Sequence, residues 1–256
     1  MSVDISVRKK LGEFDIDIAI KSGAKCIGIL GPSGSGKSML LKIIAGIETP
    51  DEGLVKVDGR VLFDSSNRIN QKPQERSVGY MFQEYALFPT MTVAQNIAAG
   101  IKAKKDEAKR RVNEIVKDYD LEGLEQKLPS QLSGGQKQRV ALARMMAYEP
   151  HALLFDEPFS AMDVSLKQDI RQELMSAIKQ YDRTSIIVTH DRDDAIMMCD
   201  WLVIIDQGRL LASGYTNQLI TNPPSQEVSK ILGCDSISRI EQEDGTIRLA
   251  RLEIVK

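Results

Sequence analysis

Residues 31–38 read GPSGSGKS, which matches the phosphate-binding pattern G-x-x-x-x-G-K-[ST] in full. Glycines in such a loop let consecutive backbone N–H groups point into one concavity that binds phosphate oxygens, and the following helix adds the positive end of its dipole. The lysine reaches the β- and γ-phosphates, and the last serine offers its hydroxyl to Mg²⁺. The pattern therefore predicts a nucleotide site formed by Gly31, Pro32, Ser33, Gly34, Ser35, Gly36, Lys37, Ser38 and Met39.

Two acidic residues, Asp156 and Glu157, follow the apolar run ALLF at residues 152–155. Carboxylates next to a buried strand are costly unless they have a partner or a role. Beside a phosphate loop, Asp156 is expected to hold Mg²⁺ and Glu157 to polarise the attacking water as a general base. The alternative is a helix cap at the end of the strand, which the following PFSAMD would partly support.

Two further polar residues, Gln83 and His190, come directly after short apolar strands. Parallel strands present their carboxyl ends to one shared crevice, so Lys37, Asp156 and His190 are all expected to face one ligand. His190 is then predicted to lie at the γ-phosphate, although a lone histidine at a strand end is more often structural. The Gln83 amide is predicted to bind Mg²⁺ or water without adding charge.

The segment LSGGQ at residues 132–136 stands directly before an Arg- and Ala-rich helix. Adjacent glycines usually mark a flexible turn, and a helix N-terminus favours a negative charge. By itself the segment indicates an anion-binding site, but the neighbouring residues in the sequence do not indicate which anion binds there.

The elements that must position these residues alternate between strands and helices, which predicts an α/β fold with a largely parallel sheet. Period-two patterning near the N-terminus and a hairpin at Asp58-Gly59 predict an antiparallel β subdomain. The polar helical pattern that follows predicts an inserted helical subdomain. Further along the chain we expect a hairpin that turns at Gly208, a helix broken by Pro223-Pro224 and two strands around Asp244-Gly245. The expected organisation is an ATP-binding core at 1–87 and 151–214, a helical subdomain at 88–150 and a short C-terminal extension at 215–256.

The composition excludes several functional classes. A formal net charge of −2 argues against a nucleic-acid binder driven by bulk electrostatics, and two histidines are too few for a His-rich metal site. Three widely separated cysteines are expected to be reduced thiols in a cytosolic protein. The basic run at 102–111 is interrupted by acids and is expected to be a solvated helix face. No apolar run is long enough to span a bilayer.

Six features resemble, in their order along the chain, the motifs of an ATP-binding cassette (ABC) ATPase over roughly residues 1–215. They are GPSGSGKS, Gln83, LSGGQ, LLFDEP, SAMD and His190. The resemblance implies a phosphate-loop NTPase (RecA-like) core, bound ATP and Mg²⁺, and a head-to-tail homodimer. In such a dimer LSGGQ closes over the ATP of the other chain. The residues implied to contact the partner's ATP site are Ser133, Gly134, Gly135, Gln136 and Asp163.

The resemblance also implies an aromatic residue that stacks on adenine. Phe14 is the only aromatic residue before Lys37, and a core phenylalanine on an alternating strand is the alternative reading. Met162 departs from the SALD that the family usually shows, where this chain has SAMD.

The stretch 76–100 is similar to importer ATPases, and GRVLFDS with KKLGEFDIDI looks most like molybdate or tungstate importers, with sulfate or ferric iron as close rivals. This implies a peripheral protein on the cytoplasmic face of the cell membrane. Its partners would be a permease, docked through the helical subdomain and residues 84–92, and indirectly a substrate-binding protein. Ordinary core aromatics are the alternative reading of YALFPT in that segment. A soluble ABC regulator without a transport role is the alternative. ILGCDSISRI resembles the entry to a regulatory barrel, but too few residues follow for a complete one.

Overall fold

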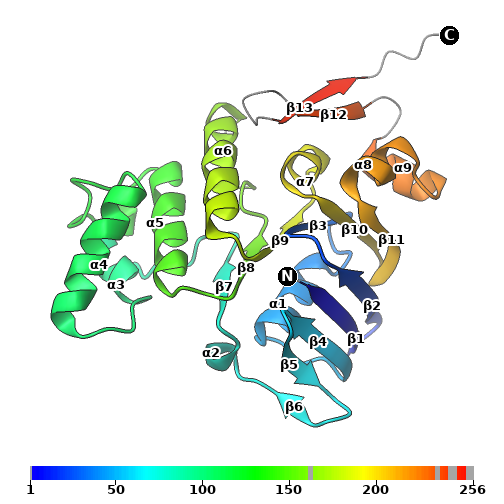
Figure 1. Ribbon diagram of the computed structural model, residues 1–256, viewed down its shortest axis with the longest axis horizontal. Helices are drawn as coiled ribbons and strands as arrows, with labels where there is room; N and C mark the ends of the chain where they lie inside the picture. The colour runs from blue at the N-terminus through cyan, green and yellow to red at the C-terminus, as the bar shows by residue number, and fades with distance from the viewer. Residues whose placement is uncertain (1, 161–163, 234–236, 242–246, 252–256) are drawn as a thin grey trace. The chain divides into compact units, whose positions relative to one another are not determined.

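The computed structural model describes residues 2–160, 164–233, 237–241 and 247–251 (Figure 1). It divides into two compact units, Met1–Arg76 with Tyr181–Lys256, and Ser77–Gln180, and each is described by itself. We refer to them as unit 1 and unit 2. The subdomain boundaries expected at 88 and 150 remain a prediction.

Unit 1 is built on one twisted sheet in the order β6-β5-β4-β1-β2-β11-β10-β3-β9 (Figure 1). Its antiparallel part pairs β1 with β2 and β4, and its parallel part pairs β3 with β9 and β10. Its strands are β1 (Val3–Leu11), β2 (Phe14–Ser22), β3 (Cys26–Leu30), β4 (Glu52–Val57), β5 (Arg60–Asp64), β6 (Ile69–Asn70), β9 (Thr184–Thr189), β10 (Trp201–Asp206) and β11 (Arg209–Tyr215).

The two parts of this sheet follow the two hydrophobic patterns of the sequence. Every second residue of β1 is buried from Val3 to Val7, because only one face of an antiparallel sheet needs to be apolar. All residues of β3 and β9 are buried, as expected for strands covered on both faces. The hairpin at Asp58-Gly59 and the hairpin at Gly208 are confirmed.

The remaining elements of unit 1 are α1 (Lys37–Ala45), α2 (Pro73–Arg76), α7 (Arg192–Met198), α8 (Thr216–Thr221), α9 (Gln226–Leu232), β12 (Ile237–Glu241) and β13 (Ile247–Arg251). The predicted helix break at Pro223-Pro224 is confirmed by the gap between α8 and α9, and β12 pairs with β13 as expected. Cys26 and Cys199 are buried and reduced, and the Cys26 thiol donates to Cys199 Sγ at 3.7 Å, whereas Cys234 lies outside the described residues.

The helix α1, which follows the phosphate loop, is fixed at its C-terminus by a buried arginine. It ends at Gly46, whose φ of 79° is left-handed. The Arg76 guanidinium lies against this glycine and donates to the carbonyls of Ile43 at 2.7 Å and Ile44 at 2.8 Å. Burial lowers the pKa of Arg76 to about 10, so the side chain stays charged at neutral pH, where a cation at a helix C-terminus is stabilising.

Unit 2 contains the parallel pair β7 (Val78–Met81) and β8 (Ala152–Asp156) and the helices α3 (Val93–Ala98), α4 (Lys105–Asp118), α5 (Gly134–Ala147) and α6 (Val164–Tyr181). A short 3₁₀ turn at Pro129–Gln131 precedes α5. Its helical core consists of Val93, Ile97, Val112, Val116, Leu121, Leu132, Val140, Ala143 and Ala147. Only Val112 and Val116 of α4 are buried, which confirms that the basic run is mainly a solvated face.

Candidate functional site

The phosphate loop begins where β3 ends and closes directly onto α1. Gly34 and Gly36 have φ values of 81° and 99°, a region that glycine adopts without strain. The Ser35 N–H donates to the Pro32 carbonyl at 3.2 Å, so the loop folds back on itself. Residues 32–34 are exposed at its tip. The predicted concave loop at the N-terminus of a helix is therefore present.

Lys37 lies across this loop. Its side chain is only 4% exposed, and its ammonium donates to the carbonyls of Gly31 at 2.8 Å and Pro32 at 2.7 Å. These bonds hold the buried, positively charged Lys37 ammonium at the concave side of the loop, where an anion would bind. Ser38 is half-buried in the first turn of α1, next to Lys37.

The loop is also held from β10 and β11, a contact that the sequence did not reveal. A Cβ on Gly31 would lie 2.0 Å from the Ile205 carbonyl oxygen, so only glycine fits there. The Gly208 N–H donates to the Ser35 carbonyl at 3.0 Å. Gly208 was recognisable as a turn residue, but nothing in the sequence indicated that this turn supports the phosphate loop.

Phe14 starts β2 and is only partly buried, whereas Ile16 and Ile18 on the same strand are fully buried. A Cβ built on Gly36 would lie 3.4 Å from the Phe14 ring atoms Cε1 and Cζ. The ring therefore lies beside the phosphate loop rather than within the hydrophobic core. This position suits an aromatic platform for a nucleotide base, which is the role predicted for it.

His190 is exposed and follows β9 directly. Because Leu30 of β3 is in register with Thr189 of β9, His190 and the start of the phosphate loop leave the sheet at the same edge. The next residue, Asp191, caps α7 by accepting from the N–H groups of Asp193 at 2.9 Å and Asp194 at 3.4 Å. Unit 1 thus brings together Phe14, the phosphate loop and His190.

The predicted acids lie in unit 2, at the end of β8. Asp156 is 6% exposed, and its Oδ2 accepts a hydrogen bond from the Tyr80 hydroxyl at 2.8 Å. Burial, followed by the negative charge of Asp156, raises the pKa of Tyr80, so the phenol remains a donor. Glu157 is partly exposed and has a left-handed φ of 48°, and its carbonyl accepts from the Ser160 N–H at 3.2 Å. Left-handed backbone at a non-glycine residue is costly and is concentrated at functional sites.

Gln83 lies in an exposed turn after β7. Two of the next residues, Tyr85 and Ala86, have left-handed φ values of 61° and 44°. Arg144 of α5 donates to their carbonyl oxygens at 3.0 Å and 2.8 Å and its guanidinium lies 5.1 Å from the centre of the Phe88 ring. The conformation of the Gln83 turn therefore depends on Arg144, a residue that no sequence pattern singled out.

The LSGGQ segment forms the N-terminus of α5. Ser133 Oγ accepts from the Gln136 N–H at 3.3 Å, and Gln136 Oε1 accepts from the Ser133 N–H at 3.0 Å. This reciprocal arrangement is a capping box, which satisfies two backbone donors at the start of the helix. Gly135 is buried, whereas Gly134 is exposed and a Cβ on it would meet nothing within 4 Å. Asp163 lies outside the described residues.

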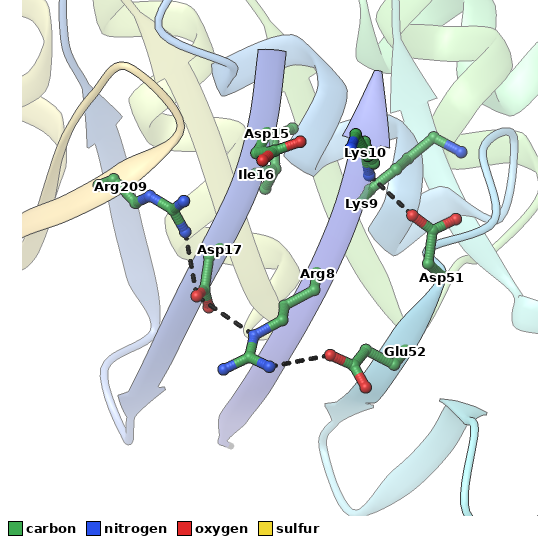
Figure 2. A pocket seen from close by; sticks show the side chains of 9 residues that line it. All are labelled: Arg8, Lys9, Lys10, Asp15, Ile16, Asp17, Asp51, Glu52 and Arg209. Carbon is green, nitrogen blue, oxygen red and sulfur yellow. Dashed lines mark hydrogen bonds and ion pairs between the residues drawn. The ribbon is translucent and has the colours of Figure 1, made fainter. Parts of the chain in front are cut away.

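A separate hollow of about 320 Å³ lies on unit 1 (Figure 2). Arg8 pairs with Glu52 at 2.9 Å and with Asp17 at 3.2 Å, and Arg209 pairs with Asp17 at 3.0 Å. These pairs bridge β4, β1, β2 and β11 in turn. None of the predicted site residues lines this hollow, and its ion pairs join side chains of neighbouring strands.

Unit 1 has a strand, a glycine loop closed by a buried lysine, and a helix, and unit 2 has carboxylates at the end of a strand. These features define a phosphate-loop NTPase. The family model described as "ABC transporter" matches residues 14–160. The chain therefore belongs to the ABC transporter family and is an ATPase of the ABC type. The predicted fold class is confirmed.

Relatives and solved structures agree with this assignment. The chain is 41% identical over 255 residues to the "Sulfate/thiosulfate import ATP-binding protein CysA" of Brucella melitensis, covering 95% of this chain and 69% of the relative. It is 41% identical to the protein of that name from Mesorhizobium japonicum, covering 96% and 72%. The dimeric ATP-binding cassette MJ0796, in a post-hydrolysis state with ADP and Pi, matches with a TM-score of 0.69 and 29% identity, covering 84% of this chain and 99% of that one. The expected preference for molybdate or tungstate receives no support from these relatives.

Proposed function

We propose that the chain is the ATP-hydrolysing subunit of an importer for an inorganic oxyanion, with sulfate or thiosulfate as the first candidate. The observation that carries this proposal is the 41% identity, over 95% of the chain, to a protein named for sulfate and thiosulfate import. Molybdate and tungstate are also tetrahedral oxyanions and remain candidates to be tested beside sulfate. The relatives' names favour an importer over a soluble ABC regulator.

The residues of the site suit ATP with Mg²⁺. The phosphate loop and Lys37 hold the triphosphate, and Phe14 stacks on the adenine. In unit 1 Ser38 offers a hydroxyl oxygen, and in unit 2 Gln83 and Asp156 offer amide and carboxylate oxygens, which are the hard ligands that Mg²⁺ prefers. Bound there, Mg²⁺ would supply positive charge that neutralises the charge developing on the phosphates. Glu157 accepts a proton from the attacking water, and His190 contacts the γ-phosphate.

The ATP site is completed by a second copy of the chain in a head-to-tail dimer. Gly134 supports this part of the proposal because its own fold has no need of a glycine there: its φ is not left-handed and a side chain would have open space. A glycine in a helix is otherwise unfavourable relative to alanine. The close approach of the partner's nucleotide explains the absence of a side chain at Gly134. The same nucleotide is contacted by Ser133, Gly135, Gln136 and Asp163.

The membrane partner is a separate permease, bound by unit 2 on the cytoplasmic face of the membrane, with a substrate-binding protein acting indirectly. Among the described residues no helix combines the length and apolar character needed to cross a bilayer. Unit 2 exposes Phe82, Phe88, Met91 and Leu128 by 36–45%. Two of these lie in the predicted docking segment 84–92. Tyr85 is also in that segment but is 6% exposed, as an ordinary core aromatic would be.

The proposal is tested by expressing the chain with a candidate sulfate permease and binding protein in a strain that lacks sulfate uptake. Restored uptake of labelled sulfate, competed by thiosulfate, supports the proposal. Uptake of molybdate alone would reassign the substrate, and failure to copurify with any permease would favour a soluble regulator. Phe88→Ser is expected to abolish uptake in the assembled transporter while ATP binding is retained. Ile47→Ser, at an exposed apolar residue of unit 1, is the matched control and should leave uptake unchanged.

A further inference from the structure

We infer that Tyr80 is a positioning residue that orients the Asp156 carboxylate for Mg²⁺, an inference that rests on the function proposed above. Its hydroxyl donates to Asp156 Oδ2 at 2.8 Å. A phenolic O–H bonded to a carboxylate is a strong, charge-assisted hydrogen bond. It restricts the rotation of the carboxylate.

The positions of both residues follow from strand register. β7 and β8 run parallel, and Tyr80 is paired with Leu154, two residues before Asp156. Residues two apart on a strand share a face, so Tyr80 and Asp156 are diagonal neighbours on one side of the sheet.

The Tyr80 ring is itself held in place. It packs against the Phe82 ring with a centroid distance of 4.4 Å. Phe82 directly precedes Gln83, the other residue of this unit that is proposed to meet Mg²⁺. Tyr80 therefore connects, through one hydrogen bond and one ring contact, the two segments of unit 2 that present oxygen ligands.

Residues that orient a metal ligand have a measurable effect on metal binding. Their loss typically weakens metal affinity by about 10- to 100-fold. Because nucleotide phosphates also hold Mg²⁺, the lower end applies here, and Tyr80→Phe should weaken metal binding about tenfold. Tyr80→Phe keeps the ring and its packing against Phe82 and removes only the donor.

The test measures binding of Mn²⁺, as a spectroscopic substitute for Mg²⁺, to the ADP complex by electron paramagnetic resonance. Nucleotide affinity in the presence of EDTA and the Mg²⁺ concentration for half-maximal ATPase activity are measured in parallel. For Tyr80→Phe we expect a rise of about tenfold in both metal half-saturation values, with unchanged nucleotide affinity in EDTA. The control is Tyr148→Phe, which removes another tyrosine hydroxyl in the same unit, one that accepts from Lys102 at 3.3 Å. This variant should leave both metal values unchanged.

The possible results separate the inference from the function on which it rests. Unchanged metal half-saturation in Tyr80→Phe would overturn the inference, as would a lowered melting temperature without a metal effect, or an equal shift in Tyr148→Phe. Asp156→Asn is measured beside them. If Asp156→Asn weakens Mn²⁺ binding and Tyr80→Phe does not, only the role of Tyr80 fails. If Asp156→Asn has no effect, the proposed metal role of Asp156 fails first.

Discussion

Replacing Gly134 by alanine separates the stability of the chain from its catalysis. Gly134 is the first residue of α5 and is exposed, and a Cβ built on it would meet nothing within 4 Å. Alanine is favoured over glycine within a helix by roughly 0.5–1 kcal/mol, because glycine loses more backbone freedom on folding. At the first position of the helix the lower end of this range applies, so Gly134→Ala should stabilise the isolated chain by about 0.5 kcal/mol.

The methyl group of alanine at position 134 should also abolish hydrolysis, because in the dimer it would lie where the partner's nucleotide approaches. We expect ATPase activity to fall by at least about 100-fold, as for the loss of a group that stabilises the transition state. Affinity for ATP in the monomer should not change, because the phosphate loop lies in the other unit. The assays are urea unfolding, calorimetric ATP binding and steady-state phosphate release.

Gly23 provides a matched control, because it also has open space and a φ outside the left-handed region. Gly23→Ala should give a similar small gain in stability and keep full activity. Normal ATPase activity in Gly134→Ala, or a loss of stability of more than about 1 kcal/mol, would refute the reasoning, since the chain itself would then require the glycine.

Three other predictions concern the remaining residues of the site and its support. Glu157→Gln should bind ATP normally but lower the rate of phosphate release by about 100- to 1,000-fold and let ATP trap the dimer, as gel filtration would detect; near-normal turnover would exclude Glu157 as the base. Lys37→Ala should weaken ATP binding by about 2–3 kcal/mol in calorimetry, through loss of a charge-assisted contact; an unchanged affinity would contradict the assigned triphosphate site. Arg76→Met should lower the free energy of unfolding by about 2 kcal/mol, because the Ile43 and Ile44 carbonyls lose their charged donor; a stability equal to wild type would show that the arginine does not hold α1.

The local elements were largely predictable, because each depends on a pattern within a few residues. The strand, glycine loop and helix around Lys37, the hairpins at Gly59 and Gly208, and the helix break at Pro223 all follow from side-chain periodicity and turn residues. The position of β11 next to β2 did not follow, because that pairing rests on a single pair in register, Arg209 with Asp17.

Parts of the site depended on contacts that no pattern encodes. Phe14 could not be distinguished from a core residue until its ring was found beside Gly36. The hydrogen bond from Tyr80 to Asp156 and the support of the Gln83 turn by Arg144 join residues that are far apart in the sequence. The letters S-G-G-Q are compatible both with the capping box of Ser133 and Gln136 and with an anion site at two adjacent glycines, so the pattern alone does not separate the two.

The central claim is that each ATP site combines the phosphate loop of one chain with the LSGGQ segment of another. Mixing two inactive variants, Lys37→Ala and Gly134→Ala, tests it directly. In a head-to-tail dimer every mixed pair has one fully intact site, so random mixing should restore about a quarter of the wild-type sites. ATPase activity that rises well above the sum of the two separate variants is the predicted result. Activity that stays at that sum, with mixed dimers shown to form, would contradict the account.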